Sequence, residues 1–155
     1  KVDGKSIGAV STYTFEKVKV NHTIEAEFTT EDEINQAKAK ELTESLLLMA
    51  RSVKTAKKNV KVRLKMNEES AAAIKELQTL GYTVKYKFYR SEKKSKQYRA
   101  TLTKSSKVYT NTQGEKGRRY YYKARVMVYD ENGTLIAKTA LKQCKYATRV
   151  WSKKK

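Results

Sequence analysis

The sequence Gly117-Arg-Arg-Tyr-Tyr-Tyr-Lys-Ala-Arg-Val-Met-Val-Tyr129 decides the fold that we expect for this chain. Its side chains alternate between two kinds, as they do along a β-strand, where successive residues point to opposite faces. One face would carry Tyr120, Tyr122, Ala124, Val126 and Val128, and the other Tyr121, Lys123, Arg125, Met127 and Tyr129. The pattern predicts a long strand of an antiparallel sheet, with its apolar face on a core and its basic face in water.

Further strands are expected on both sides of this one. The stretch Gly81–Arg90 repeats the alternation, with Tyr82, Val84, Tyr86 and Phe88 inward and Thr83, Lys85, Lys87 and Tyr89 outward. A hairpin is predicted over Ser52–Lys65, with its turn at Lys57–Asn59. Further short strands are predicted at Gln97–Thr103, Lys107–Thr110, Thr134–Thr139 and Lys142–Trp151. In the last of these, Trp151 would cover the end of a core. Asn132-Gly133 supplies a hairpin turn. Short strands with closely spaced turns predict a mostly β protein, an antiparallel β-sandwich.

Two helices are expected beside the strands. Thr30-Glu31-Asp32-Glu33 has the form of a capping box and predicts a helix or helical linker over 31–44. Asn67 can cap a short inserted helix over Glu68–Leu80, which Gly81 would end. Leu46–Ala50 reads as a buried strand or the end of the first helix. We therefore expect three parts, a β segment over 1–29, a helical linker over 30–45 and a sandwich over 46–155.

Residues 1–28 alternate more weakly and predict two short strands with a turn near Asn21-His22. Two strands alone bury too little surface to be stable. We expect them to pack on the main domain, or to pair with a neighbouring copy through an open edge.

The charge of the chain is divided unevenly along its length. Residues 1–50 hold 6 Lys/Arg against 9 Asp/Glu, a net charge of −3, whereas residues 51–155 hold 29 against 7, a net charge of +22. Clustered cations attract polyanions because binding releases counterions. Nucleic acid, an anionic bacterial cell wall, acidic glycans and anionic lipid surfaces all qualify as partners, and a merely solvated basic surface is the alternative.

The residues that catalysis requires are scarce. The only histidine, His22, lies in a predicted turn and the only cysteine, Cys144, lies near the other end, so neither an intrachain disulfide nor a Cys–His pair is expected. Glu31–Glu33 and Asp130–Gly133 are explained as a helix start and a turn, not as metal sites. We expect no catalytic residue, no metal, no cofactor and no membrane insertion, and an enzyme only as an accessory domain of a larger hydrolase.

Two segments resemble known modules. Asp3-Gly4-Lys5-Ser6, Tyr13-Thr14-Phe15 and Asn21-His22-Thr23-Ile24-Glu25-Ala26 resemble the end of internalin-type B-repeat modules of Gram-positive surface proteins. From about 46 to 151, the order Val60–Lys65, Gly81–Tyr86, Lys96–Arg99, Gly117–Val126 and Asp130–Gly133 looks like the fibronectin type III-like modules of clostridial-type surface proteins. By that resemblance, Tyr120 would be a tyrosine-corner residue whose phenol bonds to the backbone near the Gly114–Gly117 corner.

The resemblances imply a non-catalytic structural or adhesion module of a bacterial extracellular protein, of which this chain would be a fragment. Its partner would be an anionic cell-wall polymer or glycan, or a protein, and a basic nucleic-acid-binding module is the alternative. If the two central strands are neighbours, as the second resemblance implies, one basic face would carry the candidate polyanion-binding residues Lys85, Lys87, Arg118, Arg119, Tyr121, Lys123 and Arg125.

Overall fold

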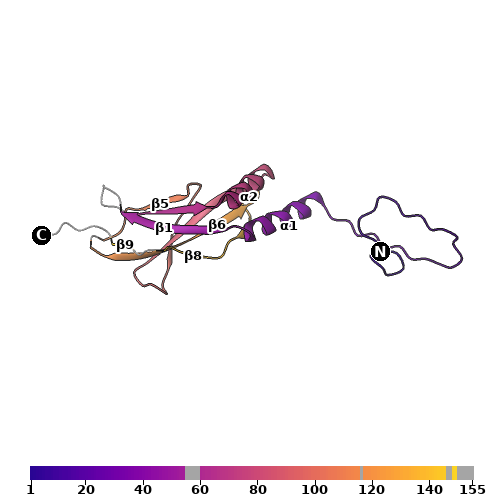
Figure 1. Cartoon of the computed structure of the whole chain (residues 1–155), viewed down its shortest axis with the longest axis horizontal. Helices are drawn as coiled ribbons and strands as arrows, with labels where there is room; N and C mark the ends of the chain where they lie inside the picture. The colour runs from indigo at the N-terminus through magenta and orange to yellow at the C-terminus, as the bar shows by residue number, and fades with distance from the viewer. Residues whose placement is uncertain (55–59, 116, 146–147, 150–155) are drawn as a thin grey trace. The chain divides into compact units, whose positions relative to one another are not determined.

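A computed structural model describes residues 1–54, 60–115, 117–145 and 148–149 of the chain (Figure 1). The turn expected at Lys57–Asn59 and the core contact expected for Trp151 lie outside the described residues. The chain divides into two compact units, Lys1–Ile34 and Asn35–Lys155. Every β-strand of the described residues belongs to the second unit.

The larger sheet of the second unit is built around the predicted long strand. This strand, β6 (Arg119–Tyr129), pairs with β3 (Thr83–Ser91) on one side and β7 (Leu135–Lys138) on the other, and β3 also pairs with β4 (Arg99–Lys104). The short strands β8 (Lys142–Gln143) and β9 (Thr148–Arg149) pair with β6 as well, so the sheet has six strands. All of these pairings are antiparallel.

The second sheet has three antiparallel strands in the order β1-β2-β5, namely β1 (Leu48–Lys54), β2 (Val60–Met66) and β5 (Val108–Asn111). Strands β4 and β5 follow each other in the chain but belong to different sheets, so the chain crosses the sandwich between them. Near the other end of the chain, the backbone N–H of Lys145 donates to the carbonyl of Ala50 on β1, at 3.0 Å. The single strand expected over Lys142–Trp151 is therefore two short strands, separated where the chain reaches across to β1.

The core lies between the two sheets and follows the predicted alternation. Its largest fully buried side chains include Tyr122, Phe88, Leu77 and the valines 60, 62, 126 and 128. Along β6, every residue expected inward from 120 to 128 is buried. Met127 departs from the pattern, since it lies on the outer face yet is only 8% exposed. The prediction of a mostly β, antiparallel sandwich is confirmed.

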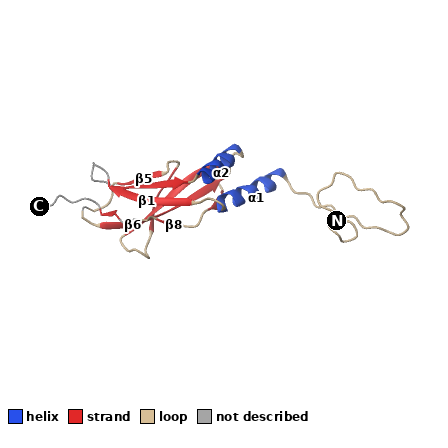
Figure 2. Cartoon of the chain, viewed as in Figure 1, coloured by secondary structure: helices blue, strands red, loops and turns tan. Residues whose placement is uncertain are grey.

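Two helices lie beside each other at one end of the strands (Figure 2). In α2 (Glu68–Thr79), Asn67 caps the first turn by accepting a hydrogen bond from the Ser70 N–H at 3.0 Å. The next residue after the Leu80 cap, Gly81, has φ +87°, the left-handed conformation that ends helices. Leu77 and Ile74 dock this helix onto the core.

The other helix, α1 (Glu31–Glu44), begins with the predicted capping box. The Thr30 N–H donates to Glu33 Oε2 at 2.9 Å, and the Glu33 N–H donates to Thr30 Oγ1 at 3.2 Å. Its later turns are not a free linker, because Ala39 and Thr43 are buried and Ala39 belongs to the sandwich core. An ion pair between Lys38 and Glu76 also ties α1 to α2.

Residues 1–30, all of which the structure describes, contain none of the strands expected there. They form only isolated bridges, from Val2 to Lys5 and from Val2 to Ile24. Most apolar residues of the segment are exposed, Phe28 for example by 90%, so they form no buried face of the kind that stabilises paired strands. The segment is instead closed by polar contacts of Asp3, which accepts from the Thr23 N–H at 2.9 Å and lies 2.8 Å from His22 Nδ1.

Candidate polyanion-binding face

The register between β3 and β6 brings the expected basic residues onto one surface. Lys87 lies opposite Arg125, and Tyr89 lies opposite Lys123. Two residues further along the strands in either direction, Lys85 lies opposite Met127 and Ser91 lies opposite Tyr121. Because outward residues alternate with the buried ones, Lys85, Lys87, Tyr121, Lys123 and Arg125 share the outer face of the six-stranded sheet, which we call the basic face.

Tyrosine rings separate the cations of the basic face. The Lys85 ammonium lies 5.2 Å from the centre of the Tyr129 ring, and the Arg125 guanidinium lies 5.5 Å from that of Tyr89. Lys123 is placed over Tyr98, with its Nζ 4.4 Å from the ring centre. Such cation–π contacts are attractive and fix the long side chains over the sheet, so the cations form an ordered array.

Sequence reasoning missed Tyr98 as a member of the basic face. This residue precedes β4, and its hydroxyl lies 2.8 Å from the Lys94 carbonyl oxygen and 3.0 Å from Gln143 Oε1 on β8. The ring is therefore held by one contact within its own loop and one with a residue 45 positions away in sequence. Gln97, just before it, has φ +57°, a conformation that a pattern of polar and apolar residues does not reveal.

The basic face has no built-in counter-charge. The strands β3, β4, β6, β7, β8 and β9 all carry Lys or Arg, and none contains Asp or Glu. Arg125 Nε is buried and, among the described residues, has no hydrogen-bond partner. Like charges held close together repel one another, so an approaching polyanion is favoured both by Coulomb attraction and by counterion release.

Arg118 does not join the basic face as expected. Its Nη1 lies 2.6 Å from Glu92 Oε2 and its Nε 2.9 Å from Glu115 Oε2, so its charge is compensated. The hydrogen bond with Glu92 and the charge of Glu115 raise the pKa of this guanidinium. Arg119 is exposed at the start of β6, on the outward side by alternation, where it lies opposite Arg149 of β9.

Tyr120 makes the contact expected of a tyrosine corner. It is buried, and its phenol oxygen accepts a 3.0 Å hydrogen bond from the backbone N–H of Glu115, within the corner before β6. The Arg90 guanidinium lies 4.9 Å from the centre of its ring. These contacts fix the turn that leads into the strand carrying most of the basic face.

The other groups weighed for chemistry are engaged or buried. Cys144 is buried, and desolvation raises the pKa of its thiol to about 12, so it carries no thiolate at neutral pH. Asp130 accepts from the Thr134 N–H at 2.7 Å inside its turn. Within the described part of the chain, no three His, Cys, Asp or Glu residues gather into a metal-binding group. Its helices are also too short and too polar to cross a membrane.

Comparisons with known proteins support the fold. No family model and no curated protein matches the sequence, so the resemblance of residues 1–28 to B-repeat modules stays a prediction. Among solved structures, the chain is similar to a fibronectin type III domain from the human KIAA0970 protein, with 11% identity, a TM-score of 0.51 and coverage of 84% of this chain and 90% of that one. An Fn3-like protein from Clostridium thermocellum matches with 20% identity, a TM-score of 0.42 and coverage of 67% and 94%. The likeness to the human domain shows that the chain has the β-sandwich fold of fibronectin type III domains.

Proposed function

We propose that this chain is a non-catalytic structural and adhesion module of a bacterial extracellular protein, and that its basic face contacts an anionic cell-wall polymer or an acidic glycan. The observation that carries the proposal is the ordered array of cations and tyrosines on β3 and β6, without a carboxylate in any described strand of that sheet. The sequence resemblance to modules of bacterial surface proteins supports the location.

The spacing of the cations suits a linear polyanion. Lys85 and Lys87 are two residues apart, as are Lys123 and Arg125, so along each strand the charges recur about every 7 Å. A polymer with one charge per repeat unit could follow either strand and neutralise several cations at once. Each neutralised cation adds to the salt dependence of binding.

Nucleic acid is the alternative partner, and the arrangement of the rings argues against it. Binding of single strands relies on bases stacking on free aromatic faces. On the basic face, Tyr89, Tyr98 and Tyr129 each have an ammonium or guanidinium group over the ring. To stack on one of these three rings, a base would have to displace its cation, whereas a charged polymer can bind to the cations directly.

The test compares two triple variants of equal charge. One replaces Lys87, Lys123 and Arg125 with Gln on the basic face, and the control replaces Lys61, Arg63 and Lys65 with Gln on β2 of the other sheet. Both lower the net charge by the same amount. Retention on isolated anionic wall polymer, on sulfated glycan and on random single- and double-stranded DNA is then measured across a salt series, with circular dichroism to verify folding.

We expect the unaltered chain and the control to remain on wall polymer or glycan at physiological salt, and the basic-face variant to elute. Equal loss of binding by both triple variants would show that net charge alone attracts the polymer, which contradicts the proposal. Retention on DNA alone would favour the nucleic-acid alternative. Retention on no polymer would leave a spacer domain without a ligand of its own.

A further inference from the structure

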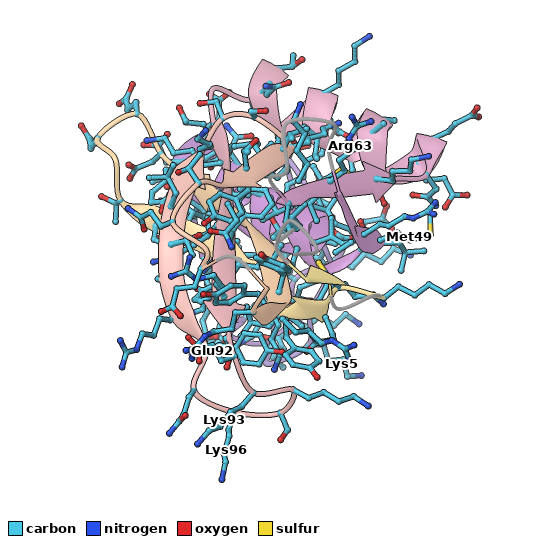
Figure 3. The ribbon with its side chains drawn as sticks, turned by 90° about the vertical axis from the view of Figure 1, so that its left-hand side faces the viewer. Lys5, Met49, Arg63, Glu92, Lys93 and Lys96 are labelled. Atoms are coloured by element: carbon cyan, nitrogen blue, oxygen red, sulfur yellow. The ribbon has the colours of Figure 1, made fainter. Side chains whose placement is uncertain are left out.

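A second basic site lies away from the basic face, in a pocket beside the loop that follows β3. The pocket has a volume of about 410 Å³ and is lined by residues of β3, β4, the loop between them and the corner before β6. Figure 3 shows this loop, with Glu92, Lys93 and Lys96, extending beyond the strands. The cations that line the pocket are Arg90, Lys93 and Arg99.

Arg90 is the fixed cation of the pocket. It lies on the inward side of β3, opposite Tyr122. Its Nη1 donates to Asn111 Oδ1 at 2.8 Å, and its guanidinium lies over the Tyr120 ring. These partners hold the side chain in place but carry no negative charge. A half-buried guanidinium without a counter-ion is energetically costly, so an anion that binds it is favoured.

The one carboxylate that lines the pocket, that of Glu92, is not a counter-ion of Arg90. Glu92 is bound to Arg118, at 2.6 Å. Among the described residues, none of the three pocket cations forms an ion pair with an Asp or Glu. Loop contacts also shape the site, because Ser91 Oγ donates to the Lys96 carbonyl at 2.7 Å and accepts from the Lys93 N–H at 2.9 Å.

The remaining donors of Arg90 can reach a ligand. Within the described part of the chain, the only buried side-chain nitrogen or oxygen without a hydrogen-bond partner is Arg125 Nε. The N–H groups of Arg90 that do not bond Asn111 are therefore open to the solvent in the pocket. A guanidinium presents its donors in a planar fork that matches two oxygens of one oxyanion.

We propose that this pocket binds a single tetrahedral oxyanion, a phosphate or sulfate group, with Arg90 as the anchoring residue and Arg99 and Lys93 as the flanking cations. The site goes beyond the proposed function, because it lies on the inward side of β3 and uses none of the cations of the basic face. It would take a free anion or one such group carried on a larger molecule.

The experiment titrates the whole chain with inorganic phosphate at constant ionic strength and follows backbone and arginine side-chain N–H signals by NMR. The test variant is Lys93→Ala with Arg99→Ala, whose side chains are exposed. The matched control is Lys104→Ala with Lys107→Ala, which removes the same charge outside the pocket. Arg90→Lys is a third variant that keeps the charge but loses the fork.

We expect saturable shifts at Arg90 and its neighbours in the unaltered chain and in the control, and a Kd about tenfold weaker or more in the Lys93/Arg99 variant, since each charge-assisted hydrogen bond contributes strongly. Arg90→Lys should also bind more weakly while staying folded by circular dichroism. Non-saturating shifts, or equal Kd values in the test variant and the control, would overturn the proposal.

A second titration distinguishes the two sources of the anion. Dimethyl phosphate resembles an internal phosphodiester of a polymer, whereas inorganic phosphate and sulfate represent free or terminal groups. Binding of dimethyl phosphate at the same signals would assign the pocket to a polymer backbone. Binding of inorganic phosphate or sulfate alone would assign it to a free or terminal oxyanion.

Discussion

The side-chain amide of Asn111 donates a 2.8 Å hydrogen bond to the phenol oxygen of Tyr122 in the interior of the sandwich. Asn111 lies on β5 and Tyr122 on β6, so this bond joins the two sheets. Both side chains are almost completely buried, with exposures of 1% and 0%. Burial raises the pKa of Tyr122 well above its usual range, although the bond to Asn111 opposes the shift. The phenol therefore stays neutral at physiological pH.

Replacing Tyr122 with Phe should lower the free energy of unfolding by about 1–3 kcal/mol, because the Asn111 amide is left buried with an unsatisfied donor. Urea denaturation of Tyr122→Phe, Asn111→Ala and the double variant forms a thermodynamic cycle. We expect the double variant to lose clearly less than the sum of the two single losses. Strictly additive losses would show that the bond contributes nothing of its own.

The Tyr120 hydroxyl should contribute less, because the Glu115 N–H that it accepts from lies near the surface. Tyr120→Phe should cost about 0.5–1.5 kcal/mol of unfolding free energy. Tyr121→Phe is the matched control, since it removes the hydroxyl of the neighbouring outward tyrosine. A loss of the same size in both variants would count against a specific role for the corner bond.

The alternation of β3 and β6 could be read from the sequence because it is local. A strand needs only every second residue to be apolar, and both stretches satisfy this. The same holds for the cap of α2, where Asn67 and Gly81 stand at the positions that such helices favour. Alternation alone does not show that these two strands are neighbours: the resemblance implied it, and the register between β3 and β6 confirms it.

The features that sequence reasoning missed depend on contacts between distant residues. Arg118 forms an ion pair with Glu92, which is 26 positions away. Tyr98 joins that face through Gln143, which is 45 positions away. The helix α1 docks through the small residues Ala39 and Thr43. Because these residues are only weakly apolar, the sequence of the helix shows no strong apolar stripe. In residues 1–28 the alternation is weak, and the segment forms only isolated bridges.

Acid should open the segment that Asp3 closes. Its hydrogen bond with His22, followed by that from the Thr23 N–H, lowers the pKa of this carboxyl below its usual value of 3.8. A lowered pKa means that the contact stabilises the segment above pH 3.8 and is lost as the pH falls through the lowered value. NMR should therefore show the Thr23 amide signal moving and its protection from exchange falling as the pH drops below 3.8.

Asp3→Asn provides the control for this titration, since it keeps an acceptor for the Thr23 N–H without the charge. We expect the pH-dependent change at Thr23 to vanish in this variant. Persistence of the same transition in Asp3→Asn would assign it to another carboxylate.

Alkaline pH should destabilise the sandwich, in part through Cys144. Its thiol keeps its proton up to about pH 12 in the folded state, whereas an unfolded thiol loses it near pH 9. The contribution of Cys144 to the free energy of unfolding is therefore fully present below pH 9. It falls above pH 9, because the unfolded state then binds fewer protons than the folded state. Buried tyrosines such as Tyr122 act in the same direction.

The contribution of Cys144 can be isolated with Cys144→Ala. The stability difference between the unaltered chain and the variant should shrink between pH 8 and 10.5, by at most about 1.4 kcal/mol per pH unit. The folded chain should also resist a thiol reagent at pH 8 and react once urea unfolds it. Rapid reaction without denaturant would contradict the burial of this thiol.

The limits of the folding unit should lie before α1 and not after it. A chain that begins at Thr29 keeps the capping box of α1 and the buried contacts of Ala39 and Thr43, so its urea midpoint should equal that of the full chain. A chain that begins at Leu46 exposes the core that Ala39 and Leu42 cover and should lose about 2–4 kcal/mol. Lys38→Ala, which removes only the surface ion pair with Glu76, should cost at most about 1 kcal/mol and so separates packing from charge. If the chain from Leu46 unfolds at the same urea concentration as the full chain, α1 is an appendage and the sandwich alone, from Leu46 onward, is the folding unit.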